Sequence, residues 1–357
     1  MENKIKNRLI WMFLVLFIVS FCGCGKLNSQ ASTGNKEESN KISATNTITD
    51  MAGKKIELKN PINKVSCIHP IASHMVWRLA PDKLSSADIQ FITRLDLMPN
   101  EAINKIKALP TTNTYSEGLN TEELMSINPD CLITMTKDPN KDNYQEKLDI
   151  PVINLSKDTL EDYGESFRIV GKVVGNEKEG NELADYWKET FEKIKTQIDK
   201  VKPTKKIKIY YAQPKGNYTV GPKTIMASIV SYVGGENFYD THEVLPAQEQ
   251  NESIETPMED IIMWNPEIII AKNQKTYDDI MSDSKWQQID AVKNHKVYVT
   301  KKYSMLDRIQ SIMGLMWTAK TVYPDIDLDF TKEMKNFYSK VYLCKDLSEE
   351  TMNIPTD

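Results

Sequence analysis

The amino-acid sequence predicts an α/β protein with two Rossmann-like lobes that are bridged by one long α-helix. Three observations support this fold class. A helix–Pro–strand unit occurs twice, short apolar strands alternate with helices in both halves, and a long helix lies between the halves. The chain of 357 residues is long enough to form two cores. We expect an N-terminal lobe over 47–175, a linking helix over 176–202 and a C-terminal lobe over 203–357 that ends in a helical tail.

The N-terminus has the features of a signal peptide. Basic residues precede an apolar run that ends at Cys22 and is short for a transmembrane helix. A small residue and Cys24 follow, as in a lipobox, where the cysteine after the cut receives diacylglycerol. We therefore expect removal of 1–23 and lipidation of Cys24. Lipidation of Cys22, a plain membrane anchor and an ordinary secreted protein are the alternatives.

The segment 24–46 has the composition of a flexible tether. It consists mostly of Ser, Asn, Gly, Lys, Glu and Thr, so it cannot bury enough apolar surface to fold. A signal, an acylatable cysteine and a tether together predict a body held at the extracellular face of the cell membrane, or in the periplasm if the envelope has two membranes. The formal net charge of −5 argues against nucleic acid as a partner.

The N-terminal half predicts strands that alternate with helices. A first strand is expected from Lys64 to Ile68, and the next helix stops before Pro81, because proline cannot continue a helix. Another strand is expected from Pro151 to Leu155. Cys67 and Cys131 fall in core strands, and no Cys-x-x-Cys indicates a zinc ribbon or a redox pair.

The linking helix is the longest periodic segment. Apolar residues recur at spacings of three and four from Leu183 to Val201, which is one face of an α-helix. Asn176 with Glu179 three residues later is typical of a capping box, and a proline closes the helix. At about 1.5 Å per residue, 177–202 would span roughly 39 Å, so we interpret it as a rigid strut.

The C-terminal half repeats the order of the first. A strand is expected from Lys206 to Ala212, and the following helix ends at a Gly-Gly pair. After the second copy of the repeated unit come a strand from Val297 to Thr300 and a helix from Gly314 to Val322, which stops before a proline. A further amphipathic helix forms the tail.

The repeated unit is "EELMSINPDCLIT" from Glu122 to Thr134 and "EDIIMWNPEIIIA" from Glu259 to Ala271. Each copy has a Glu, a short amphipathic helix, Asn-Pro, an acidic residue and an apolar run. The proline ends each helix, and the apolar runs are typical of strands buried on both faces of a parallel sheet. The repeat therefore predicts a similar helix–strand unit in each lobe.

Six segments in this order resemble the substrate-binding proteins of ABC importers, in the class with a single helical hinge that carries ferric siderophores, haem, cobalamin and related metal chelates. They are "ITDMAGKKIEL", "GLNTEELMSINPDCLI", "IVSYVGGENF", "MEDIIMWNPEIII", "WQQIDAVKNHKVYV" and "GLMWTAKTVYPD". The resemblance covers nearly all of the chain after the tether. It implies the class III periplasmic-binding-protein fold, with the ligand between the lobes. It also implies a monomeric receptor, not an enzyme, that works with an ABC permease dimer and its ATPase subunits.

The resemblance gives the repeated glutamates a role. In this family each lobe presents an exposed Glu that docks onto basic residues of one permease subunit, and Glu122 and Glu259 occupy that position. Their neighbours Glu123 and Asp260 are alternative contacts. Each Glu is also favoured in the first turn of a helix by the helix dipole alone.

Candidate ligand-binding residues follow from the rule that ligands of open α/β sheets lie beyond the C-terminal ends of the strands. Cations and aromatic side chains occur there, and they suit an anionic, partly aromatic metal chelate. The candidates are His69, Arg94, Lys137, Tyr218, Lys272, Tyr303 and Arg308. For any one lysine the alternative is a solvated surface position. Tyr303 and Arg308 lie in "YSMLDR", where the family has a cleft loop with Asp-Arg.

The histidines predict no site for a bare metal ion. His69 and His74 are the only pair close in sequence, whereas a transition-metal site needs three or four converging ligands. A single His that caps an iron or nickel chelate fits better. We expect no cofactor, and the ligand that the family favours is a ferric siderophore, with a corrinoid, haem or a nickel or cobalt chelate as alternatives.

Two other classes of protein remain as alternatives. Chelatase-like metal enzymes share the two-lobed plan, but a cytoplasmic chelatase would need neither lipobox nor tether. The sequence also has no phosphate loop, no G-x-S-x-G and no H-E-x-x-H. An adhesive surface lipoprotein would not need the paired glutamates.

Overall fold

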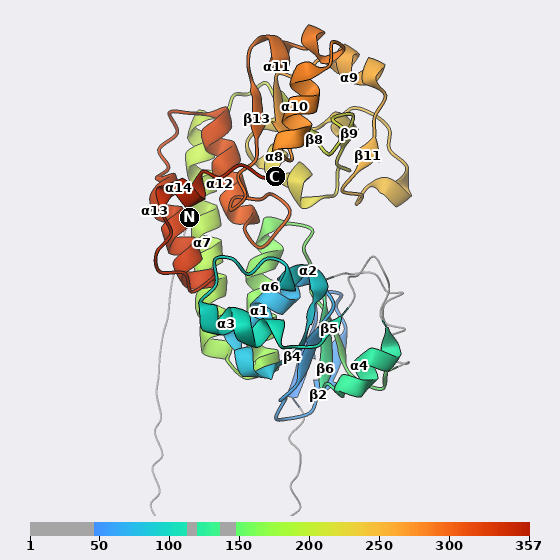
Figure 1. Cartoon of the computed structure of the whole chain (residues 1–357), viewed down its shortest axis with the longest axis vertical. Coiled ribbons are helices and arrows are strands. Elements are labelled where there is room, and N and C mark those ends of the chain that lie inside the picture. Colours follow the sequence, from blue (N-terminus) through green and yellow to red (C-terminus); the bar gives the residue numbers. More distant parts are fainter. Residues whose placement is uncertain (1–45, 113–119, 136–147) are drawn as a thin grey trace, which may run out of the picture. The chain divides into compact units, whose positions relative to one another are not determined.

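The computed structural model describes residues 46–112, 120–135 and 148–357, and it shows the expected α/β fold (Figure 1). Two parallel sheets, one in each half of the chain, form the centres of two lobes. The fold class predicted from the sequence is therefore confirmed. No helix in the described ranges combines the length and the apolar character that crossing a membrane requires.

The N-terminal lobe has a five-stranded parallel sheet in the order β5-β4-β3-β6-β7. Its strands are β3 Val65–Cys67, β4 Leu84–Asp88, β5 Thr111–Thr112, β6 Cys131–Thr134 and β7 Val152–Asn154. The helices of this lobe are α1 Pro70–Leu79, α2 Ile89–Ile92, α3 Asn100–Lys107, α4 Thr121–Ile127 and α6 Leu160–Val174. An antiparallel pair, β1 Asn46–Thr49 and β2 Lys55–Leu58, precedes the sheet. Strands β3, β6 and β7 are wholly buried, as expected for a sheet with helices on both faces.

The C-terminal lobe has a four-stranded parallel sheet in the order β10-β8-β12-β13. Its strands are β8 Ile207–Ala212, β10 Gly235–Glu236, β12 Ile268–Ala271 and β13 Val297–Val299. A separate antiparallel pair is formed by β9 Tyr218–Thr219 and β11 Ile254–Glu255. The helices are α8 Ile225–Tyr232, α9 Met258–Trp264, α10 Gln274–Ser282, α11 Asp290–Lys293, α12 Ser311–Val322, α13 Phe330–Val341 and α14 Glu349–Met352.

The repeated unit has the same local structure in both lobes. Helices α4 and α9 each have seven residues and end at an Asn with φ of 51°, Asn128 in one and Asn265 in the other. Asn tolerates this left-handed conformation better than most residues, so it can end the helix directly before Pro. Each unit then continues into a buried strand, β6 or β12. The predicted helix–Pro–strand unit is confirmed in both copies.

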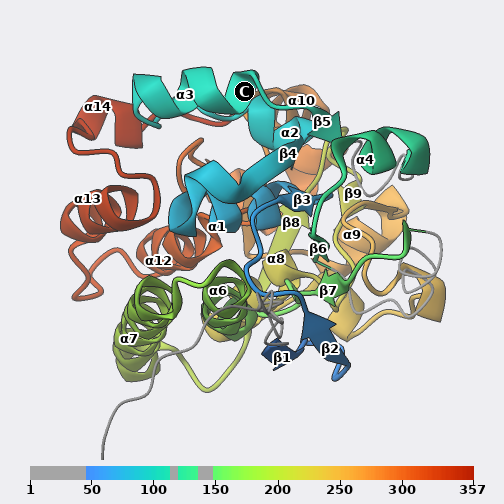
Figure 2. The ribbon, with the colours of Figure 1, turned by 90° about the horizontal axis from the view of Figure 1, so that it is seen from below.

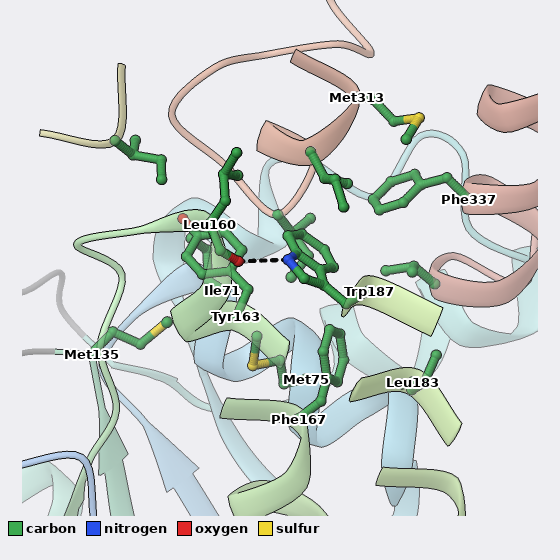
Figure 3. Close-up of a cluster of buried hydrophobic side chains, with 14 of the residues drawn as sticks. Ile71, Met75, Met135, Leu160, Tyr163, Phe167, Leu183, Trp187, Met313 and Phe337 are labelled. Atoms are coloured by element: carbon green, nitrogen blue, oxygen red, sulfur yellow. Dashed lines mark hydrogen bonds between the residues drawn. The ribbon is translucent and has the colours of Figure 1, made fainter. Parts of the chain in front are cut away.

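The long helix α7 spans Glu177–Val201 and packs along α6 (Figure 2). The two backbones approach closely, because a Cβ atom at Gly180 would lie 2.8 Å from the carbonyl oxygen of Phe167. The apolar face of α7 is buried in a cluster in which Trp187 Nε1 donates a hydrogen bond of 2.6 Å to the carbonyl oxygen of Leu160 (Figure 3). This bond satisfies the one polar atom of a fully buried indole.

The predicted capping box at the start of α7 is wrong. The side chain of Asn176 makes no cap hydrogen bond and instead donates to the carbonyl oxygen of Leu79 at 2.8 Å. Glu179 forms an ion pair of 2.6 Å with Arg78 of α1. Both side chains that local spacing assigned to a helix cap therefore hold α7 against the N-terminal lobe.

The C-terminal tail contacts both lobes. At the last residue of α13, the carbonyl oxygen of Val341 lies 2.9 Å from Nε2 of His74 in α1. Further on, the amide of Thr356 donates to the carbonyl oxygen of Thr300, just beyond β13, at 2.9 Å. The tail is thus a second connection between the lobes beside α7.

Candidate functional site

A cavity of about 790 Å³ is lined by residues of both lobes. The N-terminal lobe supplies the first turn of α1, the end of β4 with α2, and the residues after β6 and β7. The C-terminal lobe supplies the start of α8, the segments 247–252 and 307–310, and Tyr342 after α13. Cavities of this size bind small molecules and cofactors in other proteins.

The cavity lies at the carboxyl ends of the parallel strands in the N-terminal lobe. His69 follows β3, Asp88 ends β4, Met135 follows β6 and Lys157 follows β7, and all four side chains line the cavity. This is the position that the topology of a doubly wound sheet gives to a ligand. The sequence-based placement of the ligand site is consistent with this geometry.

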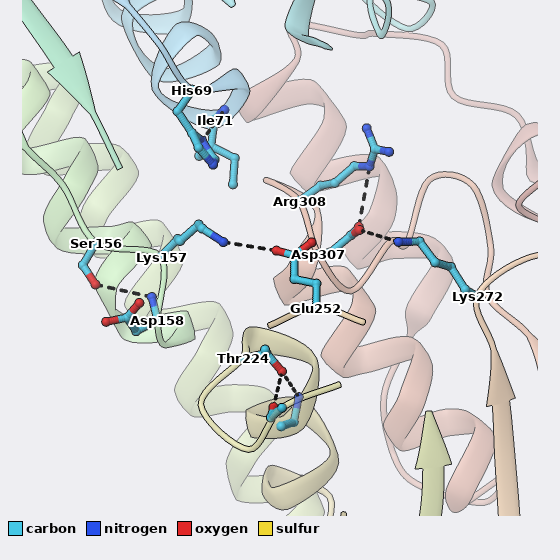
Figure 4. Close-up of polar contacts among 12 residues, drawn as sticks. His69, Ile71, Ser156, Lys157, Asp158, Thr224, Glu252, Lys272, Asp307 and Arg308 are labelled. Carbon is cyan, nitrogen blue, oxygen red and sulfur yellow. Dashed lines mark hydrogen bonds and ion pairs between the residues drawn. The ribbon is translucent and has the colours of Figure 1, made fainter. Parts of the chain in front are cut away.

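Two helices of opposite lobes begin at the cavity. His69 caps α1, where its Nδ1 accepts a hydrogen bond of 3.2 Å from the amide of Ile71. Thr224 caps α8, where its Oγ1 accepts from the amide of Ala227 at 3.3 Å. Figure 4 shows both caps at the site. Helix N-termini carry partial positive charge and unpaired amides, so they favour an anionic ligand between them.

Two guanidinium groups face the cavity from opposite lobes. Arg94 donates to Oε1 of Gln90 at 3.1 Å, and no carboxylate of the described residues lies within ion-pair distance of it. Burial lowers the pKa of Arg94, while the negative charges of Asp307 and Asp88 oppose this change. Since the ordinary pKa of an arginine lies far above neutral pH, Arg94 remains charged. Arg94 is thus a partly buried cation that has no close counter-ion in the part of the chain that the structure describes.

The second guanidinium belongs to Arg308, before α12. Its Nε lies 3.6 Å from Oδ1 of Asp307, is buried, and has no hydrogen-bond partner among the described residues. Asp307 is also 3.6 Å from Nζ of Lys272, so one carboxylate lies between two cations (Figure 4). The pairing leaves the Nε donor of Arg308 unused among the described residues.

An ion pair joins the two lobes at the cavity. Nζ of Lys157 lies 3.2 Å from Oε1 of Glu252, and both residues line the cavity (Figure 4). Nearby, Nζ of Lys223 pairs with Glu249 at 2.6 Å. These pairs are partly exposed, so each contributes little stability, but they set which charges a ligand meets on entry.

The sequence-predicted ligand residues fall into three groups. His69, Arg94 and Arg308 line the cavity, whereas Tyr218, Lys272 and Tyr303 are outside the wall that the described residues form. Tyr218 in β9 lies beneath Nζ of Lys215 at 5.5 Å. Tyr303 is buried, and its hydroxyl donates to Asp96. Lys137 and Cys24 lie outside the described residues.

Several cavity residues were not predicted. Lys157 comes three residues after the end of β7, so the rule that selected His69 could also have selected it. Tyr342 comes from the tail, and Lys223 and Glu252 come from loops of the C-terminal lobe. No spacing or motif connects these three residues with the strand ends.

The two histidines of the predicted pair have separate structural roles. The imidazole of His74 is buried, its Nε2 lies 2.9 Å from the carbonyl oxygen of Val341, and burial lowers its pKa to about 4. It is therefore a neutral donor near pH 7. Because Nδ1 of His69 accepts the amide of Ile71, the lone pair of this nitrogen is engaged in the helix cap and is not presented to a metal ion. Within the described ranges, no three His, Cys, Asp or Glu residues form a group that could hold a metal ion.

Two parallel-sheet lobes with a ligand-sized cavity between them are the arrangement found in two-lobed solute-binding proteins. Residues 88–304 match the family described as Periplasmic binding protein, and the chain belongs to this family. It is thus a class III binding protein of the ABC-importer type, a receptor and not an enzyme.

Similar proteins agree with this assignment. The chain is 23% identical to the molybdate-binding protein MolA of Haemophilus influenzae, over 84% of this chain and 91% of MolA. It is 24% identical to an iron-uptake system-binding protein of Bacillus subtilis, over 81% of this chain and 89% of the relative. A solved structure of an ABC transporter solute binding protein from Sulfurospirillum deleyianum superimposes with a TM-score of 0.73 and 24% identity. That match covers 85% of this chain and 97% of the other.

Proposed function

We propose that this receptor binds an anionic metal chelate, first of all a ferric siderophore, and delivers it to the permease of an ABC importer. The observation that carries the proposal is the pair Arg94 and Arg308, which face one cavity of about 790 Å³ from opposite lobes. Guanidinium groups bind carboxylate and catecholate oxygens with two parallel hydrogen bonds. An anion between the lobes would therefore neutralise charge on both.

Other side chains complete such a site. The N-terminus of α8 offers further donors to negative oxygens. Phe91 and Tyr342 also line the cavity and give it apolar surface for the organic part of a chelate. In this proposal the metal is cargo that its chelator already holds, so the protein supplies no metal ligand.

Molybdate is the second candidate, because the relative MolA is named for it. Helix N-termini and arginines suit an oxyanion as well as they suit a carboxylate. The volume argues for the larger ligand: a cavity of about 790 Å³ matches a drug-sized molecule, and a bare oxyanion would leave most of it to water. Corrinoid, haem and nickel or cobalt chelates remain further alternatives within the same class.

The proposal includes the delivery step. Lipidation of Cys24 would hold the receptor at the membrane, and 24–46 would act as its tether. Glu122 in α4 and Glu259 in α9 would then seat the two lobes on basic residues of the permease. Both glutamates are exposed in the first turn of matching helices, which supports this role.

The ligand class is tested by quenching of tryptophan fluorescence in the full chain. The probes are ferric catecholates, ferric hydroxamates, haem, cobalamin, molybdate, and nickel or cobalt with and without chelators. We expect saturable quenching by a ferric chelate, with affinity reduced at least about tenfold in Arg94→Gln or Arg308→Gln because a charged hydrogen bond is lost. Arg168→Gln is the matched control, since Arg168 pairs with Asp185 away from the cavity.

Other outcomes would replace the proposal. Tight binding of molybdate alone would make the protein an oxyanion receptor. Binding of free nickel or cobalt, lost in His69→Ala, would indicate a metal-ion receptor. No binding across the panel would leave the fold unchanged and favour an adhesive surface lipoprotein.

A further inference from the structure

We infer that Met125 and Met263 form a pair of apolar contacts that dock the two lobes onto the permease dimer, next to the proposed glutamate contacts. The inference rests on the proposed function, because the permease is the partner to which it commits. It extends that function by adding an apolar component to a docking surface that the glutamates alone would make purely electrostatic.

The two methionines are unusually exposed for their type. Met263 is 76% exposed and Met125 is 60% exposed, whereas most large apolar side chains of the described residues are buried. Single exposed apolar residues are common on protein surfaces and need no explanation. Here the two occur on α4 and α9, the two copies of the repeated unit, at adjacent rather than equivalent positions, since Met125 aligns with Ile262 and Met263 aligns with Ser126.

Each methionine lies on the same face of its helix as the docking glutamate. Met125 is three residues after Glu122, and Met263 is four residues after Glu259. Residues three and four apart on a helix are neighbours. One residue in each helix, Leu124 in α4 and Ile261 in α9, is fully buried and fixes the orientation of this face. Each lobe thus presents a carboxylate and an apolar side chain side by side.

The pairing of charge and apolar surface indicates the kind of partner. The first turn of α4 carries Glu122 and Glu123, and that of α9 carries Glu259 and Asp260. Both helices lie on the side of the folded unit away from α7 (Figures 1 and 2). Two similar patches on two lobes suit a partner that offers two similar basic sites, as a dimer of permease subunits does.

Methionine is a suitable residue for such a contact. Its side chain is flexible and polarisable, so it can fill a pocket that changes shape, and it is enriched in protein interfaces. A permease must bind the loaded receptor and release the empty one. An adaptable apolar contact tolerates that change better than a rigid one.

The test places a photo-crosslinking benzoylphenylalanine at single positions of the full chain in its source cells. Positions 125 and 263 test the inference, and positions 123 and 260 test the glutamate docking of the proposed function. Val201, an exposed apolar residue at the end of α7, is the control position. We expect cross-links from 125 and 263 to a membrane-spanning permease subunit, and none from 201.

The cross-linking result distinguishes a failure of the methionine contact from a failure of the proposed glutamate docking. Cross-links from 123 and 260 but not from 125 and 263 would overturn the methionine contact and leave the docking proposal intact. The absence of permease cross-links from all four positions would overturn both. Equal cross-linking from 201 would show that contact is non-specific and would overturn the inference as well.

A second measurement uses the importer that the cross-link identifies, solubilised in detergent. We expect Met125→Gln and Met263→Gln each to weaken its affinity for the receptor about tenfold, because a buried methionine contact is replaced by a polar group of similar size. Met125→Leu and Met263→Leu should bind nearly as the wild type does. Equal affinities for the Gln and Leu variants would contradict the inference.

Discussion

At the scale of single residues, His74 shows how burial determines the protonation state of a side chain. Its ring contacts Tyr342 edge-on with centroids 4.4 Å apart, and its Nε2 lies 2.9 Å from the carbonyl oxygen of Val341. Burial lowers its pKa from 6.5 to about 4, and the positive charge of Arg78 acts in the same direction, while the hydrogen bond opposes it. The neutral ring is therefore part of the contact between α1 and the tail.

This predicts a pH dependence of the free energy of unfolding. The unfolded chain binds the proton more tightly, so the contribution of His74 is complete above pH 6.5 and is lost as the pH falls toward 4. The shift corresponds to about 3 kcal/mol over this range. We expect His74→Phe to remove that part of the slope in urea titrations between pH 6.5 and 4. His295→Asn, at an exposed site, should retain it, and an unchanged slope in His74→Phe would contradict the assignment.

Gly221 supports the cavity wall in another way. A Cβ atom at this position would lie 2.4 Å from the carbonyl oxygen of Glu249 and 2.6 Å from that of Gln248. The amide of Gly221 also donates to the carbonyl oxygen of Asn251 at 2.8 Å. The segment that carries Glu252 into the cavity is therefore packed directly against a glycine.

We expect Gly221→Ala to displace this segment. The free energy of unfolding should fall by about 2 kcal/mol, as at other overpacked sites. Ligand binding should also become weaker, because Glu252 lies on the displaced segment. Thermal unfolding and fluorescence titration measure the two effects. Gly164→Ala is the control, because its added Cβ would meet its nearest atom at an ordinary 3.4 Å. Equal behaviour of the two variants would show that the close approach at Gly221 is not required.

At the scale of elements, a polar cluster joins the loop after α2 to the loop after β13. Asp96 accepts from the hydroxyl of Tyr303 and pairs with Nζ of Lys302 at 2.8 Å. Burial alone would raise the pKa of Asp96, but these hydrogen bonds lower it, and the bond to Asp96 raises the pKa of Lys302 to about 12. The contribution of this cluster to the free energy of unfolding is complete between about pH 4 and 10. It is lost below that range as Asp96 protonates, and above that range as Lys302 deprotonates.

Loss of this cluster should loosen the two lobes. We expect Asp96→Asn to raise the dissociation rate of the bound ligand several-fold, because the lobes separate more readily when their charged contact is removed. Stopped-flow competition measures the rate. Glu101→Gln removes a carboxylate from an exposed pair within one helix, with Lys105, and should leave the rate unchanged. A rate in Asp96→Asn equal to that of the control would contradict the role of the cluster.

The elements themselves were largely predictable from the sequence. The expected first strand from Lys64 to Ile68 contains β3, and the expected linking helix over 177–202 ends one residue beyond α7. Apolar periodicity and prolines determine these elements locally, so they can be inferred without tertiary contacts.

The candidate site was predictable only in part. The rule of strand ends correctly brings His69 to the cavity, but it also selects Tyr303, whose hydroxyl donates to a residue 207 positions earlier in the chain. Tyr342 reaches the cavity through the packing of the tail, and Asn176 donates to Leu79 across 97 positions instead of capping its helix. Such pairings depend on how distant elements meet, which no local spacing encodes.

At the scale of the whole folded unit, contacts connect the two lobes at several places. Helix α7 packs closely on α6, the tail contacts both lobes, and the pair Lys157–Glu252 joins them at the cavity. Such a design favours ligand capture by a nearly preformed site, with small closure rather than a wide hinge motion.

We therefore expect little change in the radius of gyration on ligand binding. Small-angle scattering of the protein, with and without the ferric chelate that quenches its fluorescence, measures this directly. Removal of the residues after Leu343 should make the change in the radius of gyration larger. The truncated chain lacks the hydrogen bond between Thr356 and Thr300, so the tail no longer connects the lobes. A large domain rotation in the intact chain would contradict the role of α7 as a strut.

The central claim is that an anionic metal chelate binds between Arg94 and Arg308. Anomalous diffraction at the iron absorption edge, from crystals of the protein with a bound ferric catecholate, tests it most directly. The account predicts one strong iron peak inside the cavity, with chelate oxygens facing both guanidinium groups. An iron peak outside the cavity, or bound by protein side chains without the chelator, would contradict it.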